Sequence, residues 1–182
     1  MRRIWDMEKE KIVIASDHGA FELKQKLIAR LHELGFVTED MGAYSADSVD
    51  YPDFAEKVAR AVSQKKTARG ILLCGTGIGM GITANKFPGV RAATVYDNYT
   101  ARMSRLHNDS NILVLGGRTT GEETAYDILK TWLETPYEGG RHDRRIKKIS
   151  ELENTTRIDT RQEGEEPAGE VPAAGSGAGE GK

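Results

Sequence analysis

Apolar residues recur along this chain with two alternating periods. Short β-branched runs, of which IVIAS at 12–16 is the first, are typical of buried strands. Longer segments with apolar residues three or four positions apart, such as 21–34, indicate amphipathic helices. The pattern predicts strands at 12–16, from 36–37, at 70–73, 90–95 and 111–115, and helices at 21–34, 54–62, 82–86, 98–107, 120–134 and 143–154.

Strands and helices alternate throughout, which predicts an α/β fold. We expect a single Rossmann-like, three-layer domain with a parallel sheet of about five strands and helices on both faces. The loops that follow the strands then share one edge of the sheet, so Asp17-His18, 74–79 and Tyr96-Asp97 should lie together. Thr120 with Glu123 three residues later predicts a capping box at the start of the last sheet-covering helix.

The chain divides into one domain and two flanking segments. Its 182 residues suit one domain, expected at 11–154 after an N-terminal extension at 1–10. Residues 155–182 are rich in Gly, Ala, Glu and Pro and contain no aromatic residue, so we expect a disordered tail there.

Charge and cysteine content restrict the class of protein. A net charge of −2 gives no global attraction to nucleic acid or to a membrane surface. The single cysteine cannot form an internal disulfide, and no apolar run is long enough to span a bilayer. The N-terminus has no apolar stretch after its two arginines, so it does not read as a signal peptide, and we expect a cytoplasmic protein.

A glycine-rich segment follows the strand at 70–73. Four glycines alternate with other residues from Gly75 to Gly81, so backbone amides there could hold a phosphate or a developing enediolate. The segment lacks the Gly-Lys-Ser/Thr ending of a Walker A loop, and a tight strand-to-helix turn is the alternative. Cys74 precedes it, either as a thiolate base favoured by amide dipoles or as an inert buried cysteine.

Other candidate residues each have a structural alternative. Asp17 could bind a substrate hydroxyl or cap a helix, and His18 beside it could bind phosphate. His107 could move a proton to a sugar ring oxygen or end a helix at the surface. One cysteine and four scattered histidines show no zinc-ligand spacing, so we expect no metal site.

A basic cluster begins at Arg141. Arg141 and Arg145 lie four residues apart, so a helix places both on one face, where their guanidinium groups could bind phosphate. Arg118 could join them if a partner subunit brought it near. Lys147 and Lys148 read as a solvated helix face, and nucleic-acid binding by the cluster is a further alternative that the net charge disfavours.

Six motifs stand in one order along the chain. They are SDHGAFELK at 16–24, DYPDFA at 50–55, CGTGIGMGITANK at 74–86, RLHNDSN at 105–111, LGGR at 115–118 and YEGGRHDRR at 137–145. On these motifs the sequence resembles the type B ribose-5-phosphate isomerases, within the wider family that includes the galactose-6-phosphate isomerase subunits. The resemblance runs from about residue 11 to residue 152.

The resemblance implies a role for each candidate. Cys74 resembles the base that moves a proton between C2 and C1 of the sugar, and His107 resembles the residue that opens the furanose ring. Thr76 would lie by the reacting carbons and help either ring opening or proton transfer. The enediolate hole would be formed by the amides of Gly75, Gly77, Ile78 and Gly79. Asp17 and Asn108 would bind the sugar hydroxyls, and Tyr51 would line the sugar site. The phosphate would be bound by His18, Arg118, Arg141 and Arg145. His142 lies within the same motif without an assigned role.

The resemblance also implies an assembly and a substrate. Cys74 together with Met80, where another branch has a glutamate, indicates the cysteine-dependent branch, which uses no cofactor. Family members are homodimers or homotetramers with shared active sites, so His107, Asn108 and Arg118 are expected to reach a neighbour's site. The expected reaction interconverts ribose 5-phosphate and ribulose 5-phosphate. Allose 6-phosphate, galactose 6-phosphate, a four-carbon sugar phosphate and a non-catalytic sugar-phosphate sensor remain alternatives.

Overall fold

A five-stranded, all-parallel sheet forms the centre of the molecule. The computed structural model describes residues 10–162, and the side chains of 10–155. Most of the expected N-terminal extension, and residues 163–182 of the expected tail, lie outside the described residues. The strands are β1 (Lys11–Ser16), β2 (Val37–Asp40), β3 (Arg69–Cys74), β4 (Ala92–Thr94) and β5 (Ile112–Gly116), in the order β2-β1-β3-β5-β4.

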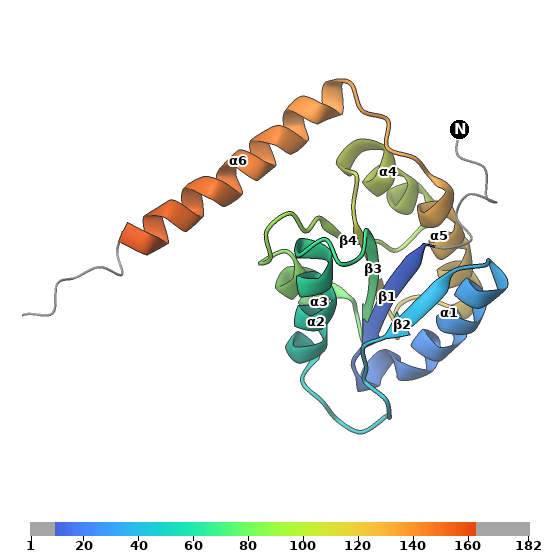
Figure 1. Ribbon diagram of the computed structural model, residues 1–182. Helices are drawn as coiled ribbons and strands as arrows, with labels where there is room; N and C mark the ends of the chain where they lie inside the picture. The colour runs from blue at the N-terminus through green and yellow to red at the C-terminus, as the bar shows by residue number, and fades with distance from the viewer. Residues whose placement is uncertain (1–9, 163–182) are drawn as a thin grey trace, which may run out of the picture.

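Helices cover both faces of this sheet, which confirms the expected three-layer α/β fold (Figure 1). Figure 1 shows α2 and α3 on one side of the strands and α1 and α5 on the other. The helices are a short 3-10 turn, η2 (His18–Ala20), followed by α1 (Phe21–Glu33), α2 (Tyr51–Ser63), α3 (Ile78–Ala84), α4 (Asn98–Asn108), α5 (Glu122–Glu134) and α6 (Arg141–Gln162). No helix within 10–162 is both long enough and apolar enough to cross a bilayer.

The central strands are apolar because both of their faces are covered. In β3, Ile71 and Leu73 point into the core under α1 and α5, whereas Leu72 and Cys74 point into the core under α2 and α3. Successive side chains of a strand point to opposite faces, so one run of apolar residues serves both cores. Cys74 is the last residue of β3, so its side chain lies at the carboxyl end of a strand that is buried throughout.

Four helices begin at other residues than the sequence predicted, and α3 and α5 are the first two. We expected helix 82–86 after a long glycine loop, but α3 begins at Ile78, so Gly79 and Gly81 lie inside a helix. A Cβ atom on Gly79 would lie 2.7 Å from the ring of Tyr51, so this glycine permits close packing rather than a turn. The capping box was wrong, because α5 begins at Glu122 with Gly121 at its N-cap and no capping side chain.

The bounds of two other helices, α2 and α6, also differ from the predicted ones. Helix α2 begins at Tyr51, three residues before the expected start, because Pro52 is tolerated in the first turn of a helix. Helix α6 runs from Arg141 to Gln162, beyond the boundary expected at 154. Figure 1 shows α6 projecting from the layered body.

The order of the strands defines a switch point between β1 and β3. From β1 the chain crosses through α1 on one face to β2, and from β3 it crosses through α3 on the other face to β4. The loops after β1 and β3 therefore diverge and leave a crevice at the carboxyl edge of the sheet, where ligands bind in open α/β folds. Asp17 and Cys74 lie at these two strand ends.

Candidate active site

Cys74 lies at the mouth of a tight backbone turn. Its side chain is 5% exposed, and the backbone N–H of Gly77 donates to Sγ over 3.1 Å. Gly77 adopts a positive φ of 83°, and a Cβ atom there would lie 3.1 Å from the backbone of Leu115. The turn therefore requires glycine at this position, and it places a backbone amide directly against the sulfur.

Three loops at the carboxyl edge are joined by backbone hydrogen bonds. The N–H of Asp17 donates to the carbonyl of Leu73 over 3.1 Å, and the N–H of Gly117 donates to that of Cys74 over 2.8 Å. The N–H of Arg118 donates to the carbonyl of Gly75 over 2.9 Å. The expected convergence of Asp17-His18 with the segment from Cys74 is thus confirmed, and the loop after β5 joins it.

The carboxylate of Asp17 is held in this crevice without a partner. Asp17 is 8% exposed, and Oδ1 has no hydrogen-bond partner among the described residues. Asp17 precedes η2, yet its side chain makes no capping bond. Helix capping therefore does not explain this aspartate, and a buried carboxylate oxygen without a partner suits a ligand hydroxyl.

Arg118 and Gly75 meet Asp17 around Gly19. A Cβ atom on Gly19 would lie 3.3 Å from Asp17 Oδ1, 3.5 Å from Arg118 Nη2 and 3.5 Å from the amide nitrogen of Gly75. No carboxylate within the described part of the chain forms an ion pair with Arg118. Its guanidinium group is therefore available to an anion that enters the crevice. Arg118 thus lies beside the loop of its own chain, and its expected reach into a neighbour's site stays a prediction.

His18 presents one defined donor to the same region. Its Nδ1 accepts a hydrogen bond from the backbone N–H of Val49 over 3.2 Å, so a neutral ring carries its proton on Nε2. His18, Gly117, Arg118 and Thr120 contribute to the lining of a cavity of about 420 Å³. His18 and Arg118 bring an N–H donor and a guanidinium group, which bind phosphate, to a cavity that Glu22, Lys26 and Glu122 also line.

The rest of the glycine segment forms the wall of the crevice. Tyr51 packs its ring on Gly79 and is 40% exposed, while Ile78 is 52% exposed at the start of α3. Thr76 is exposed, and its Oγ1 accepts a weak hydrogen bond from the N–H of Ile78 over 3.4 Å. Met80 is fully buried in the core below the loop.

The other expected site residues lie at the opposite edge of the sheet. Helix α4 ends at Asn108, shortly before β5 begins, so His107 and Asn108 lie near the amino ends of the strands. Arg141 and Arg145 lie in the first two turns of α6, close to the same helix end, because the N–H of Glu138 donates to the carbonyl of Leu106. A five-residue strand is about 16 Å long. In one chain the expected residues thus form two separate groups.

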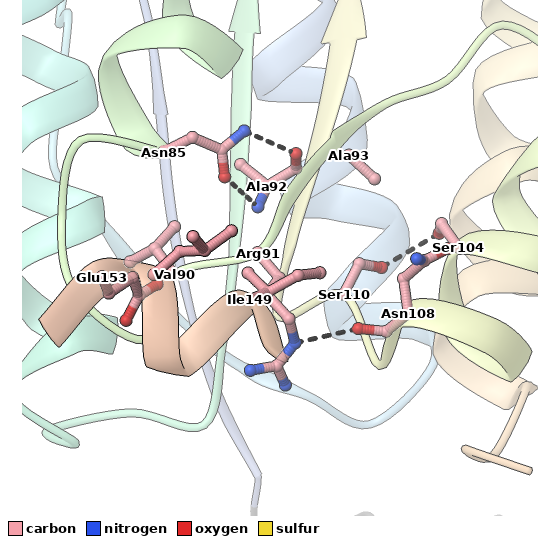
Figure 2. Close-up of a pocket in the computed structure, with 11 residues that line it drawn as sticks. Asn85, Val90, Arg91, Ala92, Ala93, Ser104, Asn108, Ser110, Ile149 and Glu153 are labelled. Atoms are coloured by element: carbon pink, nitrogen blue, oxygen red, sulfur yellow. Dashed lines mark hydrogen bonds between the residues drawn. The ribbon is translucent and has the colours of Figure 1, made fainter. Parts of the chain in front are cut away.

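A second cavity, of about 540 Å³, lies at this amino edge between β4, α4 and α6 (Figure 2). Asn108, Ile149 and Glu153 contribute to its lining. Its charged groups are already paired: Arg91 binds Asp109 and the carbonyl of Asn108, and Glu153 accepts the N–H of Gly89. This pairing leaves no free cluster of titratable groups within it.

His107, Glu138 and His142 form a cluster that the sequence spacing did not predict. One donor atom from each lies within 4.8 Å of the others, and two imidazoles with a carboxylate are a ligand set that suits zinc. However, the Nε of Arg141 donates to Nε2 of His142 over 3.3 Å, and the two rings are stacked. A neighbouring cation and parallel rings oppose metal coordination, so the cluster fits proton handling better. The spacing of Glu138 and His142, four apart, was the one available signal.

The surroundings of His142 lower its pKa, which favours the neutral ring in the folded protein. Its pKa is lowered by desolvation, then by His107 and Arg141, while Glu138 acts in the opposite direction and Arg145 adds a smaller lowering. The unfolded chain protonates this histidine below about pH 6.5. Between that pH and the lowered pKa, the unfolded state binds more protons than the folded state, so the free energy of unfolding decreases as the pH falls.

We therefore expect the His142→Phe variant to lose less stability than the parent chain between pH 7.5 and pH 5.5. Phenylalanine keeps a flat buried ring but has no group that titrates. Urea denaturation at both pH values, at equal protein concentration, measures the difference. An identical loss of stability in the two proteins would contradict a neutral, buried His142.

The chain is similar in sequence to known proteins over most of its length. The family model described as Ribose/Galactose Isomerase matches residues 12–149. Ribose-5-phosphate isomerase B of Escherichia coli is 44% identical over 144 residues, which cover 79% of this chain and 97% of that protein.

Solved structures agree with this match. The structure of ribose-5-phosphate isomerase B from Clostridium thermocellum is similar with a TM-score of 0.79 at 50% identity, covering 80% of this chain and 99% of that one. The enzyme from Mycoplasma genitalium, solved with bound ribulose-5-phosphate, gives a TM-score of 0.78 at 40% identity, covering 81% and 98%. Both likenesses extend over nearly the whole length of those enzymes.

Proposed function

The chain belongs to the ribose/galactose isomerase family, and from this premise we propose that it interconverts ribose 5-phosphate and ribulose 5-phosphate. One observation carries the proposal. Cys74, with a backbone amide on its sulfur, lies in the same crevice as a carboxylate oxygen of Asp17 and the guanidinium group of Arg118, neither of which has a partner among the described residues. These are a base, a hydroxyl ligand and an anion ligand, as an aldose–ketose isomerase of a sugar phosphate needs.

The chemistry at Cys74 is a proton transfer between two carbons. In the open-chain aldose, the thiolate removes the proton from C2, and the C1 carbonyl oxygen takes up the electron pair to give a cis-enediolate. Amides of the segment from Gly75 to Gly79 stabilise that oxygen, and each such donor is typically worth about 3 kcal/mol. A proton then passes from the C2 hydroxyl to the C1 oxygen, the thiol of Cys74 returns its proton to C1, and the C2 carbonyl forms to give the ketose, with Thr76 beside the reacting carbons.

The residues at the opposite edge complete this site from a second copy of the chain. His107 is proposed to open the furanose ring, Asn108 to bind a hydroxyl, and Arg141 with Arg145 to clamp the phosphate beside His18 and Arg118. These four residues lie near the amino ends of the strands, about one strand length from the carboxyl edge at which Cys74 lies. This division supports a homodimer or homotetramer with shared active sites as part of the proposal.

The proposal also covers the cofactor, the pathway, the location and the partners of the enzyme. The reaction requires no redox cofactor and belongs to the pentose phosphate pathway. The lone cysteine and the sugar-phosphate substrate fit a cytoplasmic location. The basic start of α6 is assigned to phosphate binding, so nucleic acid is not a proposed partner.

A turnover screen with purified full-length protein tests the substrate. We expect isomerisation of ribose 5-phosphate at a kcat/KM at least about tenfold above that for allose 6-phosphate, galactose 6-phosphate or erythrose 4-phosphate. One methylene in a pocket typically changes specificity by about 10- to 200-fold. Preferential turnover of a six-carbon or four-carbon phosphate would contradict the assignment to ribose 5-phosphate but leave the isomerase chemistry in place.

A further inference from the structure

Two imidazole rings and a carboxylate form a compact group at the start of α6. The rings of His107 and His142 are stacked, with centroids 4.3 Å apart and planes within 9° of parallel. Oε2 of Glu138 lies 3.8 Å from Nε2 of His107 and 3.7 Å from Nε2 of His142. The side chain of His107 is 35% exposed and that of His142 is 3% exposed. His142 is therefore the buried ring against which the more accessible ring of His107 packs.

The segment that carries Glu138 is fixed to the end of α4. The backbone N–H of Glu138 donates to the carbonyl of Leu106, the residue before His107, over 3.1 Å. The N–H of His142 donates to the carbonyl of Gly139 over 3.2 Å, and the hydroxyl of Tyr137 donates to Asp143 over 2.8 Å. Glu138 and His142 consequently hold a defined position relative to His107.

The two rings have different charged neighbours. Two stacked rings repel each other when both are protonated, and Arg141 lies against Nε2 of the buried ring. Glu138 is the carboxylate that contacts both rings among the described residues. A proton on His107 therefore faces a carboxylate, whereas a proton on His142 would also face a guanidinium group.

We propose that Glu138 and His142 are positioning residues for ring opening by His107, an inference that rests on the proposed function. In this step the C1–O4 bond of the furanose breaks and its electron pair goes to O4, which takes a proton from the imidazolium of His107. The C1 hydroxyl releases its proton to water as the carbonyl forms. Glu138 stabilises the imidazolium, and the flat ring of His142 holds its plane.

Glu138→Gln separates ring opening from the later proton transfer. Ribulose 5-phosphate has no furanose form, because the oxygen that would close the ring carries the phosphate. Removal of its C1 proton therefore needs no ring opening. We expect isomerisation of ribose 5-phosphate to fall about tenfold or more. The rate at which solvent deuterium enters C1 of ribulose 5-phosphate, followed by NMR, should stay within about twofold of the parent chain, because that step does not use the general acid.

Matched variants distinguish positioning from folding. Glu138→Asp should restore part of the lost isomerisation, and His142→Phe should retain more of it than His142→Ala. Glu134→Gln removes the same charge from an exposed position at the end of α5 and should change neither rate. Equal losses in both reactions for Glu138→Gln, or no loss in either, would overturn the inference. A parent chain that performs neither reaction contradicts the proposed function instead.

Discussion

Cys74→Ala is expected to abolish isomerase turnover while the chain still binds sugar phosphate. The variant removes the proposed base and leaves Asp17, Arg118 and the glycine loop in place. A positioned general base contributes about 10²- to 10⁴-fold to rate, so we expect a loss of at least about a hundredfold in kcat. Calorimetric titration with ribose 5-phosphate should give a Kd within about threefold of the parent chain, because the clamp supplies binding energy remote from the reacting carbons.

Two controls are needed for the Cys74→Ala variant, one for its folding and one for the alternative that the chain is a sensor. Cys74 packs under α2 and α3, so its truncation costs some stability, and thermal unfolding of the variant must show that it is folded at the assay temperature. Retained turnover in the folded variant would eliminate Cys74 as the base. A parent chain that binds sugar phosphate without turning it over would instead indicate the sensor alternative.

The layers of the fold could be predicted from the sequence because burial on both faces leaves a simple pattern. Every strand expected from an apolar run is present, including the run at 70–73, which is extended by one residue at each end as β3. The capping box at Thr120 failed for a local reason. Gly121 lies between Thr120 and the helix and takes the N-cap position, and the buried hydroxyl of Thr120 has no hydrogen-bond partner among residues 10–155.

The start of α3 depended on contacts that no local pattern reports. Gly79 and Gly81 look like loop residues in a sequence, because glycine weakens helices. In the fold, the ring of Tyr51 and the hydroxyl of Thr94 occupy the space that side chains at these positions would need. Both partners are distant in sequence, so the glycines reflect tertiary packing rather than loop flexibility.

The candidate site was predictable only as far as topology determines it. Asp17 and Cys74 each follow a strand, and parallel strands bring their carboxyl ends together. The position of Arg118 beside Gly75 depends on β5 being next to β3, a strand order that the sequence pattern leaves open. The stacking of His107 on His142 depends on how the segment 137–143 packs against the end of α4. No hydrophobic period in the sequence predicts that contact.

The separation of these two groups leads to a prediction about mixed oligomers. In one chain, Cys74 ends β3 at the carboxyl edge, whereas His107 lies at the amino edge, about a strand length away. If the site is shared, each catalytic unit takes Cys74 from one copy and His107 from another. A chain that lacks one of these residues can then be complemented by a chain that lacks the other.

We expect that Cys74→Ala and His107→Asn chains are each at least about a hundredfold less active alone, and that mixing them restores turnover. In a hybrid dimer one site has lost both residues and the other retains both. Random exchange in a one-to-one mixture makes half of the dimers hybrids with one working site, so activity should reach about a quarter of the parent value. The subunits are mixed in mild denaturant and refolded, and the two variants refolded separately give the baseline. Activity at that baseline in a mixture shown by mass spectrometry to contain hybrids would place Cys74 and His107 of one chain in the same site and contradict the shared arrangement.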